Sequence, residues 1–567
     1  MPEFTREEEK MLANFVTNTN KDIFCIFNLP EVVKGALFSR YSRSTKSLRR
    51  VLLDEFILDK QVGFAELVNY QEQTGISKAV ATKKAEEFYE RVLVGFGDDS
   101  VAELAGAHVA IENISNIATK FIEDSRLGIS PLEKSTRYIY FDQKINEKYP
   151  FYRDQTIMGS EFAEVYEQTC DALFDVYTKL IQKMSKFYEE KFHKEIGVSE
   201  RAYASILRAK TCDTLRGILP ASTLTNMGAF GNGRAFEYLL TKMYASDLEE
   251  INNIAKVLHN ELRCIIPTFV QTTDGKYGKA YQEYISKTRE CTISLVRKLI
   301  EDLRLTEDLK PTEDPKIIEG LNLKTAKIDP IFIHLPSVDL IDYDANGEQK
   351  VIAAIIYANS HISNSRISMR GALRIANSLS AEKKLELISV YVGERQNRRH
   401  KPYRAFENTY YTFDICANFG AYRDIHRHRV LTQERQLIST NFGYDIPEDI
   451  IDAGFEAEFN GAMSAAKNAY EIISKKMPKQ AQYVVPLAYK IKWYMKMNLR
   501  EAYHLSELRS VQQGHPDYRK IAHEIFKKIK EIHPNLANGM KFVDLKNYEL
   551  ERLEAEKKID KKIQQNQ

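Results

Sequence analysis

Two short polar patterns are the first candidates for chemistry in this chain. Arg427, His428 and Arg429, with His426 beside them, form the densest cation cluster of the second half. Arginine forks suit phosphate or pyrophosphate groups, and a histidine can hydrogen-bond or stack on a ring system. Runs of charge usually lie on solvated surfaces, so an exposed basic face is the alternative interpretation.

The second pattern lies in the first half, where Glu133, Ser135 and Arg137 alternate at a spacing of two. In an extended segment this spacing turns all three side chains to one side. Such a row would hold a nucleotide, with Arg137 on a phosphate, Ser135 on a phosphate or base edge, and Glu133 on a sugar hydroxyl. A polar strand face without a ligand is the alternative, and it is the more common outcome for an isolated pattern of this kind.

The elements that must position these residues belong to an internal repeat. Three matched pairs share one offset of 266 residues: Pro220 with Pro486, Asn232 with Asn498, and Arg234 with Arg500. A second stretch repeats at an offset of 304 residues, where Glu103 matches Glu407. Matches at constant offset, inside segments of similar apolar pattern, predict two tandem copies of one domain.

The two offsets differ by 38 residues, so the first copy carries about that many extra residues. They fit the region 145–200, where apolar residues at three/four spacing from Phe162 to Met184 predict a long helix. Residues 306–325 are charged and contain two prolines, which is typical of a linker. The predicted organisation is a first domain over 1–305, a linker over 306–325, a second domain over 326–548 and a charged tail over 549–567.

Each copy mixes strand and helix patterns. Residues 409–417 alternate apolar and polar side chains, as a half-buried strand does, and 419–429 then turn helical. A strand is also expected within 330–344, at the start of the second copy, and a long helix over 461–477. The predicted fold class is therefore mixed α/β.

Composition bounds the function classes. The 567 residues are 43% hydrophobic and 28% charged, the profile of a soluble globular protein, and the net charge of +2 argues against coating nucleic acid. The six cysteines lack a C-x-x-C pair, so neither a zinc site nor a disulfide framework is expected, and reduced thiols in a cytoplasmic protein are the simpler interpretation. No secretory signal and no membrane-spanning run is found. The basic stretch 395–401 is interpreted as a solvated loop rather than a guide for anionic cofactors.

Taken together, these segments resemble the flavin-dependent thymidylate synthase family, which is marked by the motif R-H-R-x-x-S-x-N-E-x-S-x-R-Y. Neither copy holds the whole motif. The second copy keeps the front of it, Arg427-His428-Arg429, and then departs from the pattern at Thr432 and in the segment QERQLIST. The first copy has lost the front and keeps the back of the motif: Glu133, Ser135, Arg137 and Tyr138.

The family also has an arginine before a Leu-Pro step, then N-x-R, then a histidine and an arginine further along the same helix. The first copy has the early members of this set, with Met243 in place of the last arginine: Arg216, Asn232 and Arg234. The second copy has Gln482 in place of the first arginine and keeps the later set: Asn498, Arg500, His504 and Arg509.

The resemblance implies two tandem copies of the family fold and a site divided between them. It implies that deoxyuridine monophosphate (dUMP) is held by Glu133, Ser135, Arg137, Arg216 and Arg509. It implies that flavin adenine dinucleotide (FAD) is held by Arg427, His428, Arg429, Asn498, Arg500 and His504, with Asn232 and Arg234 from the first copy. In the family these sites lie between subunits of a homotetramer, so a homodimer of the fused chain would imitate that tetramer.

The implied activity is methylation of dUMP to thymidylate (dTMP), with 5,10-methylenetetrahydrofolate as carbon donor and NADPH as reductant. The implied partners are a small-molecule nucleotide and a folate, and no metal, nucleic acid or membrane is expected. Two alternatives remain open from the sequence. One is a related flavin enzyme acting on another uracil-containing substrate, because the QERQLIST segment is altered. The other is a nucleotide-binding or scaffold protein that has lost catalysis, because both motifs are broken.

Overall fold

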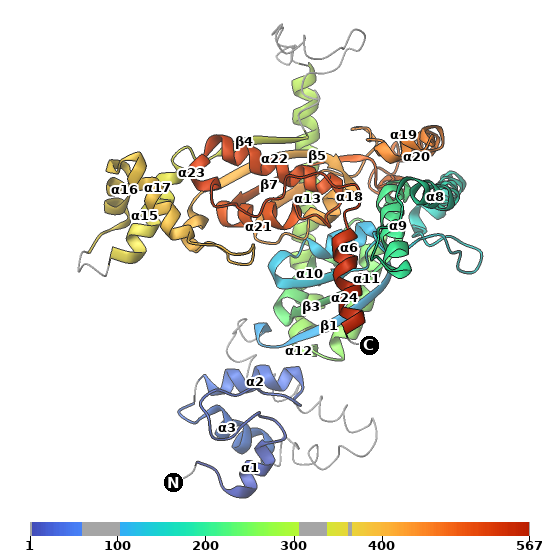
Figure 1. The fold of residues 1–567 in the computed structure, drawn as a ribbon. Helices are drawn as coiled ribbons and strands as arrows, with labels where there is room; N and C mark the ends of the chain where they lie inside the picture. The colour runs from blue at the N-terminus through green and yellow to red at the C-terminus, as the bar shows by residue number, and fades with distance from the viewer. Residues whose placement is uncertain (1–2, 43, 59–101, 306–336, 361–365, 566–567) are drawn as a thin grey trace. The chain divides into compact units, whose positions relative to one another are not determined.

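The computed structural model describes residues 3–42, 44–58, 102–305, 337–360 and 366–565 (Figure 1). The chain divides into two compact units. The first comprises Met1–Glu112, Phe121–Glu133 and Asn226–Asp302, and the second comprises Asn113–Lys120, Lys134–Thr225 and Leu303–Gln567. These units do not coincide with the two sequence copies, because the middle of the first copy belongs to the same compact unit as the second copy. The predicted linker, 306–325, lies outside the described residues.

The first copy begins with short helices and then forms a sheet. The early elements are α1 (Arg6–Leu12), α2 (Glu31–Tyr41), α3 (Leu48–Val51) and a π-helical segment, Leu52–Ile57. The sheet has the order β1-β3-β2, from β1 (Gly106–Ser115), β3 (Leu224–Asn232) and β2 (Ile129–Glu133). The intervening helices are α6 (Asn116–Glu123), α7 (Gln155–Met158), α8 (Ala163–Lys191) and α9 (Glu200–Leu215), with short 3-10 helices at Arg126–Gly128 and Arg216–Ile218.

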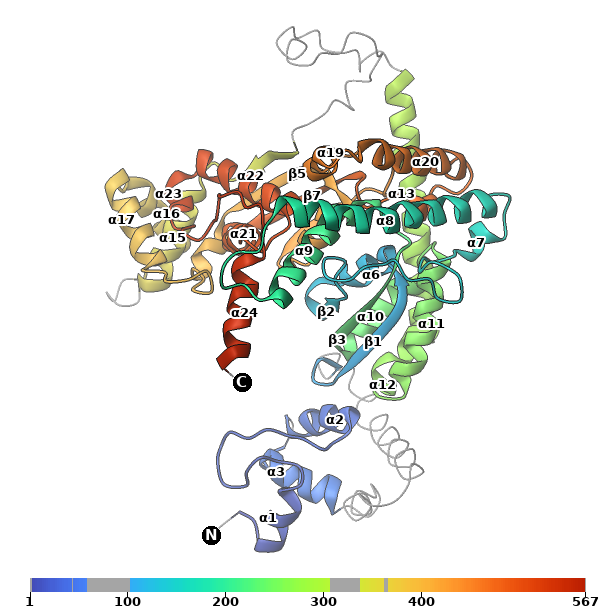
Figure 2. The same cartoon turned by 45° about the vertical axis from the view of Figure 1, so that its right-hand side comes forward.

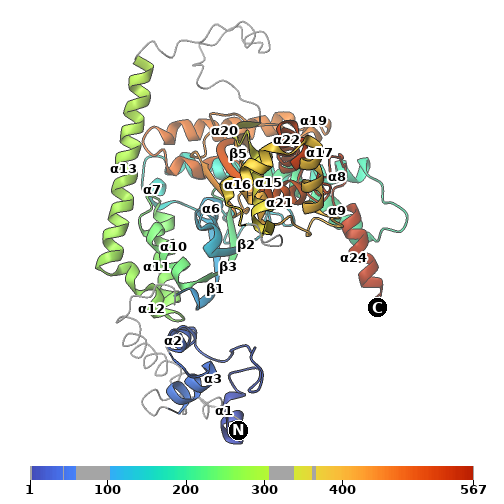
Figure 3. The ribbon, with the colours of Figure 1, turned by 90° about the vertical axis from the view of Figure 1, so that its left-hand side faces the viewer.

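Helices follow the last strand of the first copy. They are α10 (Gly233–Tyr244), α11 (Glu249–Arg263), α12 (Pro267–Val270), a 3-10 helix at Gln271–Asp274 and α13 (Lys276–Leu305). Figure 2 shows α10 and α11 beside the three-stranded sheet, and Figure 3 shows α13 as one long continuous helix. Of the helices in the described part of the chain, none is both long and apolar enough to cross a membrane.

The second copy is built on a four-stranded antiparallel sheet of order β4-β5-β7-β6. Its strands are β4 (Val338–Tyr343), β5 (Tyr410–Asn418), β7 (Lys490–Asn498) and β6 (Leu431–Arg435). On β7 alternate residues, Ile491, Trp493 and Met495, are buried, which is the period-two pattern of a strand with one covered face. The predicted strand over 409–417 is confirmed as β5, and β4 lies within the stretch 330–344.

The helices of the second copy come in three groups. The helices α15 (Gly347–Asn359), α16 (Met369–Ser378) and α17 (Ala381–Val392) precede β5, with a 3-10 helix at Arg404–Asn408. Between β5 and β7 lie α18 (Phe419–Ile425), α19 (Glu448–Asp452), α20 (Glu456–Ser474) and a 3-10 helix at Gln480–Val484. After β7 come α21 (Leu499–Arg509), α22 (Pro516–Ile532), α23 (Pro534–Ala537) and α24 (Leu553–Gln565), and α22 packs against β4 and β5.

The two copies share one topology, which confirms the mixed α/β fold of tandem copies. The order β1-β3-β2 is repeated as β5-β7-β6. Asn232 accepts a hydrogen bond from the amide of Ala235 and caps α10, and Asn498 caps α21 in the same way through Glu501. A side-chain oxygen at this position satisfies an amide that the first helical turn leaves unpaired. The matched asparagines are therefore the points where strand turns into helix in each copy.

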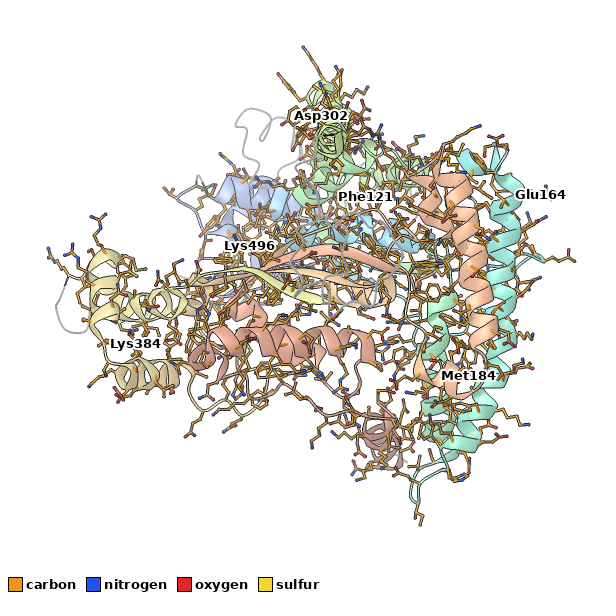
Figure 4. The ribbon with its side chains drawn as sticks, turned by 90° about the horizontal axis from the view of Figure 1, so that it is seen from above. Phe121, Glu164, Met184, Asp302, Lys384 and Lys496 are labelled. Carbon is orange, nitrogen blue, oxygen red and sulfur yellow. The ribbon has the colours of Figure 1, made fainter. Side chains whose placement is uncertain are left out.

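The long helix predicted within 145–200 is present as α8, and the position of the extra residues of the first copy stays a prediction. Figure 4 shows α8, with Glu164 and Met184 labelled, lying side by side with α20. The structure also has α9 at 200–215, a helix that the apolar pattern did not single out.

The Leu219-Pro220 step of the first copy pairs with the matched Val485-Pro486 step of the second. Pro220 and Pro486 form an antiparallel bridge. On either side of it, the amide of Ala221 donates to the carbonyl of Val485 at 2.8 Å, and the amide of Leu487 donates to the carbonyl of Leu219 at 2.9 Å. This pairing lies within the second unit, and it fixes the end of α9 against the second copy.

Residues 549–567, predicted as a charged tail, contain α24, which packs on α9. Asp560 accepts hydrogen bonds from the hydroxyl of Ser199 at 2.6 Å and from Arg201 at 2.7 Å. Beneath these polar contacts, Leu550 and Leu553 pack on the buried face of α9. The charged side chains of this segment therefore serve partly to dock it.

Candidate functional site

Two buried arginine–aspartate groups lie at the centre of the second unit. The guanidinium of Arg137 forks onto Asp213, with Nε 2.8 Å from Oδ1 and Nη2 2.6 Å from Oδ2. Asp424 accepts from Arg216 at 3.0 Å on one oxygen and from Arg427 at 2.6 Å on the other. Arg137, Asp213 and Arg216 come from the first copy, whereas Asp424 and Arg427 come from the second. One compact unit thus brings together predicted site residues from both copies.

Electrostatics keep both aspartates ionised. Burial raises the pKa of Asp213, but the charge and hydrogen bonds of Arg137 outweigh burial and bring that pKa down to about 2. Burial also raises the pKa of Asp424, and the charges of Arg216 and Arg427 hold that pKa well below its usual range. Each carboxylate therefore compensates part of the charge of the surrounding arginines, and the cluster keeps a positive excess suited to an anion.

This pairing gives a pH prediction for Asp213. Its folded pKa of about 2 lies below the ordinary value of 3.8, so the pair adds stability above about pH 4 that is lost as pH falls towards 2. The shift corresponds to about 2 kcal/mol. We expect Asp213→Asn to remove this part of the acid sensitivity, measured by urea unfolding between pH 5 and pH 2.5 with the fluorescence of buried Trp493. An unchanged acid dependence in the variant would contradict the assignment.

Tyr518, on α22, joins the Arg137–Asp213 pair to helix α21. Its hydroxyl accepts from Nη1 of Arg137 at 3.0 Å. The Cζ atoms of Arg137 and Arg509 each lie 5.6 Å from the centre of its ring, within the range of cation–π attraction. Arg137 of the first copy and Arg509 of the second copy, both predicted to contact the substrate, are thus held on one aromatic ring.

A hydrogen-bonded chain runs from Arg509 to the start of α21. Nε of Arg509 donates to Nε2 of His428 at 2.9 Å, and Nδ1 of His428 lies 2.7 Å from Oε1 of Glu501. An arginine Nε–H can only donate, so Nε2 of His428 is unprotonated and its ring proton sits on Nδ1, facing Glu501. Burial lowers the pKa of His428 well below its usual range and raises the pKa of Glu501 to about 7.

The same histidine and glutamate, with His504, are the candidate metal ligands among the described residues, since their ligand atoms lie within 4.8 Å of one another. Coordination through Nδ1 of His428 would leave the ring without a proton while Nε2 still accepts from Arg509. Burial, with Lys401, Arg509 and Arg398 adding positive charge, also lowers the pKa of His504 to about 4. The donor set therefore favours a hydrogen-bonded chain in a cationic setting over a bound cation.

The N-x-R residues make matching contacts in the two copies. Arg500 donates to Glu407 at 2.8 Å and to the carbonyl of Pro402 at 2.8 Å. In the first copy, Arg234 donates to Glu103 at 2.9 Å. The repeated glutamate, Glu103 or Glu407, therefore pairs with the repeated arginine, Arg234 or Arg500, in each copy. In the first unit this pair borders a cavity of about 670 Å³, which also includes Asn232 and the tyrosines Tyr238, Tyr277 and Tyr281.

The remaining predicted residues are placed as follows. Ser135 accepts from the amide of Arg137 at 3.2 Å, and so shapes the turn that leads into the arginine. Glu133 is the last residue of β2, opposite Met227, and belongs to the first unit. Arg429 is half-buried between α18 and β6. The ring of His504 lies 5.3 Å from that of His428.

Several site residues were missed from the sequence. Asp213 and Asp424 each precede an arginine by three residues, Arg216 and Arg427, a spacing that places acid and base on one helical face. For Asp424 this spacing marks its pair with Arg427, whereas the fork partner of Asp213 is the distant Arg137. The interpretation of 395–401 as a solvated loop needs correction at its first residue, because Arg395 is buried and forks onto Glu507 at 2.6 and 2.5 Å. Glu507 compensates the charge of Arg395, and this ion pair anchors the loop to α21.

The fold and the site define a class: a duplicated α/β protein whose two copies contribute unlike residues to one cluster of arginines and aspartates. The thymidylate synthase complementing protein family (Thy1) matches residues 52–268 and 339–535. The chain belongs to this family and carries its domain twice.

Relatives match this chain along almost its whole length. A UPF0159 protein of Chlamydia muridarum is 42% identical over 98% of each chain, and one of Chlamydia pneumoniae is 40% identical over 98% of each. A UPF0159 protein of Thermoplasma acidophilum is 32% identical, over 92% of this chain and 97% of its own. Among solved structures, the UMP/dUMP methylase PolB from Streptomyces cacaoi bound with 5-Br dUMP matches at 18% identity and a TM-score of 0.28, covering 36% of this chain and 93% of that one.

Proposed function

We propose that this protein is a flavin-dependent thymidylate synthase that methylates dUMP to dTMP, using 5,10-methylenetetrahydrofolate and NADPH, at a composite site. The observation that carries the proposal is the cluster in which Arg137 and Arg216 of the first copy, with Arg427 and Arg509 of the second, surround buried Asp424. Membership of the Thy1 family supports the reaction class. If one site is divided between the two copies, each copy needs only its own half of the motif. This explains why the first copy lacks the front of the motif and the second copy lacks the back.

The substrate side of the proposed site consists of Ser135, Arg137, Arg216 and Arg509, with Glu133 ending the strand before them. Nη2 of Arg216 is buried and has no hydrogen-bond partner among the described residues, so a charged donor is available there. A Cβ at Gly420 would lie 3.4 Å from that nitrogen, so glycine leaves room beside it. A buried unmatched donor costs stability unless a ligand meets it, and a phosphate dianion suits it.

The flavin side of the proposed site in the second unit consists of Arg427, His428, Arg429, Asn498, Arg500 and His504. Asn232 and Arg234, the other residues expected to hold FAD, belong to the first unit. Half-buried arginines such as Arg427 and Arg429 fit the pyrophosphate of FAD by charge and geometry. The bound flavin supplies hydride chemistry, with NADPH as its reductant. This chain's own residues bind and orient the reactants and place positive charge where the uracil ring becomes negative. A cytoplasmic homodimer that imitates the family's tetramer belongs to this proposal.

The glutamine that replaces the pre-Leu-Pro arginine in the second copy supports a single composite substrate site. Gln482 accepts from the amide of Ile438 at 3.0 Å and donates to the carbonyl of Lys479 at 2.8 Å. In the altered QERQLIST segment, Gln433 donates to the carbonyl of His426 at 2.9 Å. Both glutamine side chains hydrogen-bond to the backbone. This is consistent with loss of the substrate site that the second copy would otherwise have.

The test is a visible absorption spectrum of the protein reconstituted with FAD, followed by turnover with dUMP, methylenetetrahydrofolate and NADPH. We expect a bound-flavin spectrum that changes on titration with dUMP, and formation of dTMP detected by nucleotide chromatography. UMP serves as the matched second substrate, because it differs only at the ribose 2′ position. Methylation of UMP with dUMP untouched would favour the related enzyme, and a colourless, inactive protein would contradict the proposal.

A further inference from the structure

The motif arginine Arg137 has little capacity left for a ligand. Its Nε and Nη2 bind Asp213, Nη2 also donates to the carbonyl of Gln513 at 3.2 Å, and Nη1 donates to Tyr518. An arginine has five N–H groups, so four of those of Arg137 are already used within the protein. In this chain Asp213 therefore takes the fork that a phosphate would otherwise receive.

A second arginine stands on the other side of Asp213. Arg552 lies just before α24, only 6% of it is exposed, and its Nη2 is 3.5 Å from Oδ2 of Asp213. Neither Nη1 nor Nη2 of Arg552 has a hydrogen-bond partner among the described residues. Buried charged donors without such partners are unusual and costly, which makes them a sign of a missing ligand.

The stacking of Arg552 fixes its plane while leaving its donors available. Its Cζ lies 3.9 Å from the centre of the ring of Tyr138, the residue that follows Arg137. A guanidinium stacked in this way uses its flat face, and its N–H groups remain in the plane of the fork that suits phosphate. Docking of α24 on α9 through Asp560 and Arg201 holds the segment that carries Arg552.

We propose that Arg552 binds the 5′-phosphate of the nucleotide substrate, and so takes over the role that Asp213 removes from Arg137. The inference rests on the proposed function. Arg552 lies beyond residue 535, where the second Thy1 match ends, so the C-terminal segment contributes to substrate recognition in this two-copy chain. The ligand class is a nucleoside 5′-monophosphate, because a phosphomonoester dianion can accept from both unpartnered nitrogens of the Arg552 fork.

The test compares dUMP with deoxyuridine by calorimetry in the full-length protein carrying Arg552→Gln. We expect dUMP to bind about 10- to 100-fold more weakly, because a charge-assisted contact is lost, while deoxyuridine binding is unchanged. Arg552→Lys, which keeps the charge, should recover part of the affinity for dUMP. Arg208→Gln is the matched control, since Arg208 stacks on Tyr140 at 4.7 Å on the same helix as Asp213 but is exposed. The fluorescence of Trp493 verifies folding.

Inorganic phosphate serves as a second probe. It distinguishes failure of the proposed role of Arg552 from failure of dUMP as the proposed substrate. Phosphate binding that depends on Arg552, with no binding of dUMP, would support the inference and refute dUMP as substrate. Equal affinity of wild type and Arg552→Gln for dUMP would overturn the inference alone. Equal weakening of dUMP and deoxyuridine would also overturn it, because Arg552 would then only pack on Tyr138. A wild-type protein that binds neither phosphate nor dUMP overturns both.

Discussion

Replacement of Asp213 by alanine is expected to lower the free energy of unfolding of the second unit by about 3–5 kcal/mol. The reason is that the substitution leaves Arg137, and with it Arg552, buried without its carboxylate. Breaking one side of a buried pair costs far more than the pair itself contributes, because the remaining charge stays out of water. Urea unfolding followed by Trp493, the single tryptophan of the chain and a residue of β7, measures the loss in the unit that contains the pair.

Glu161→Ala is the matched control for that experiment. Glu161 pairs with Lys476, and both side chains are more than half exposed. Exposed pairs contribute little, so this variant should stay within about 1 kcal/mol of wild type. An Asp213→Ala protein as stable as Glu161→Ala would show that the buried fork on Arg137 does not stabilise the unit.

Arg137→Ala and Arg509→Ala, one substitution in each copy, are each expected to reduce methylation of dUMP by at least about 100-fold. Two independent sites would leave about half of the activity in either single variant. A shared site loses its function from either side, because both guanidinium groups lie on the ring of Tyr518. Arg137 positions Asp213 and Tyr518, and Arg509 places its charge beside His428. Loss of one positioned hydrogen-bond donor typically costs about 2.7–4 kcal/mol of transition-state stabilisation, or about 10²–10³ in rate. Steady-state formation of dTMP by the reconstituted enzyme gives the measurement.

Two further variants make that result specific. Arg263→Ala removes an arginine that pairs with Asp274 on the surface of the first unit, and it should leave the rate unchanged. Arg509→Lys keeps the charge but cannot reproduce the Nε–H bond to His428, so we expect only partial recovery. Retention of half the wild-type rate in both alanine variants would refute the composite site.

The sequence alone was sufficient for the repeat and for the local structure around it. Matched asparagines, with glutamates and arginines at their own offsets, reflect contacts made inside each copy: a cap for α10 and α21, and an ion pair beside each helix. These contacts are made again in each copy, so the pattern of residues repeats with the structure. The mixed α/β class follows from the same local signals.

The sequence also suggested which residues matter, but not how they are joined. It proposed that Arg137 and Arg427 belong to one divided site, and the second unit brings them into one cluster. It did not predict that Asp213 occupies the fork of Arg137, or that Glu501 and Arg509 meet through His428. It also placed Arg395 in a solvated loop and Arg552 in a charged tail.

By itself, the sequence determined the duplication and showed that the first copy keeps the back of the motif and the second copy keeps the front. What only the tertiary structure decided is the partner of each charged group. Arg137 lies 76 residues from Asp213, and Arg216 lies 208 residues from Asp424, so no local spacing specifies either pair. The physical reason is that burial forces each charge to find a counter-charge or a ligand, and which one it finds depends on the path of the whole chain. Asp213 and Arg552 thereby alter what the motif residues can do, although neither belongs to the motif.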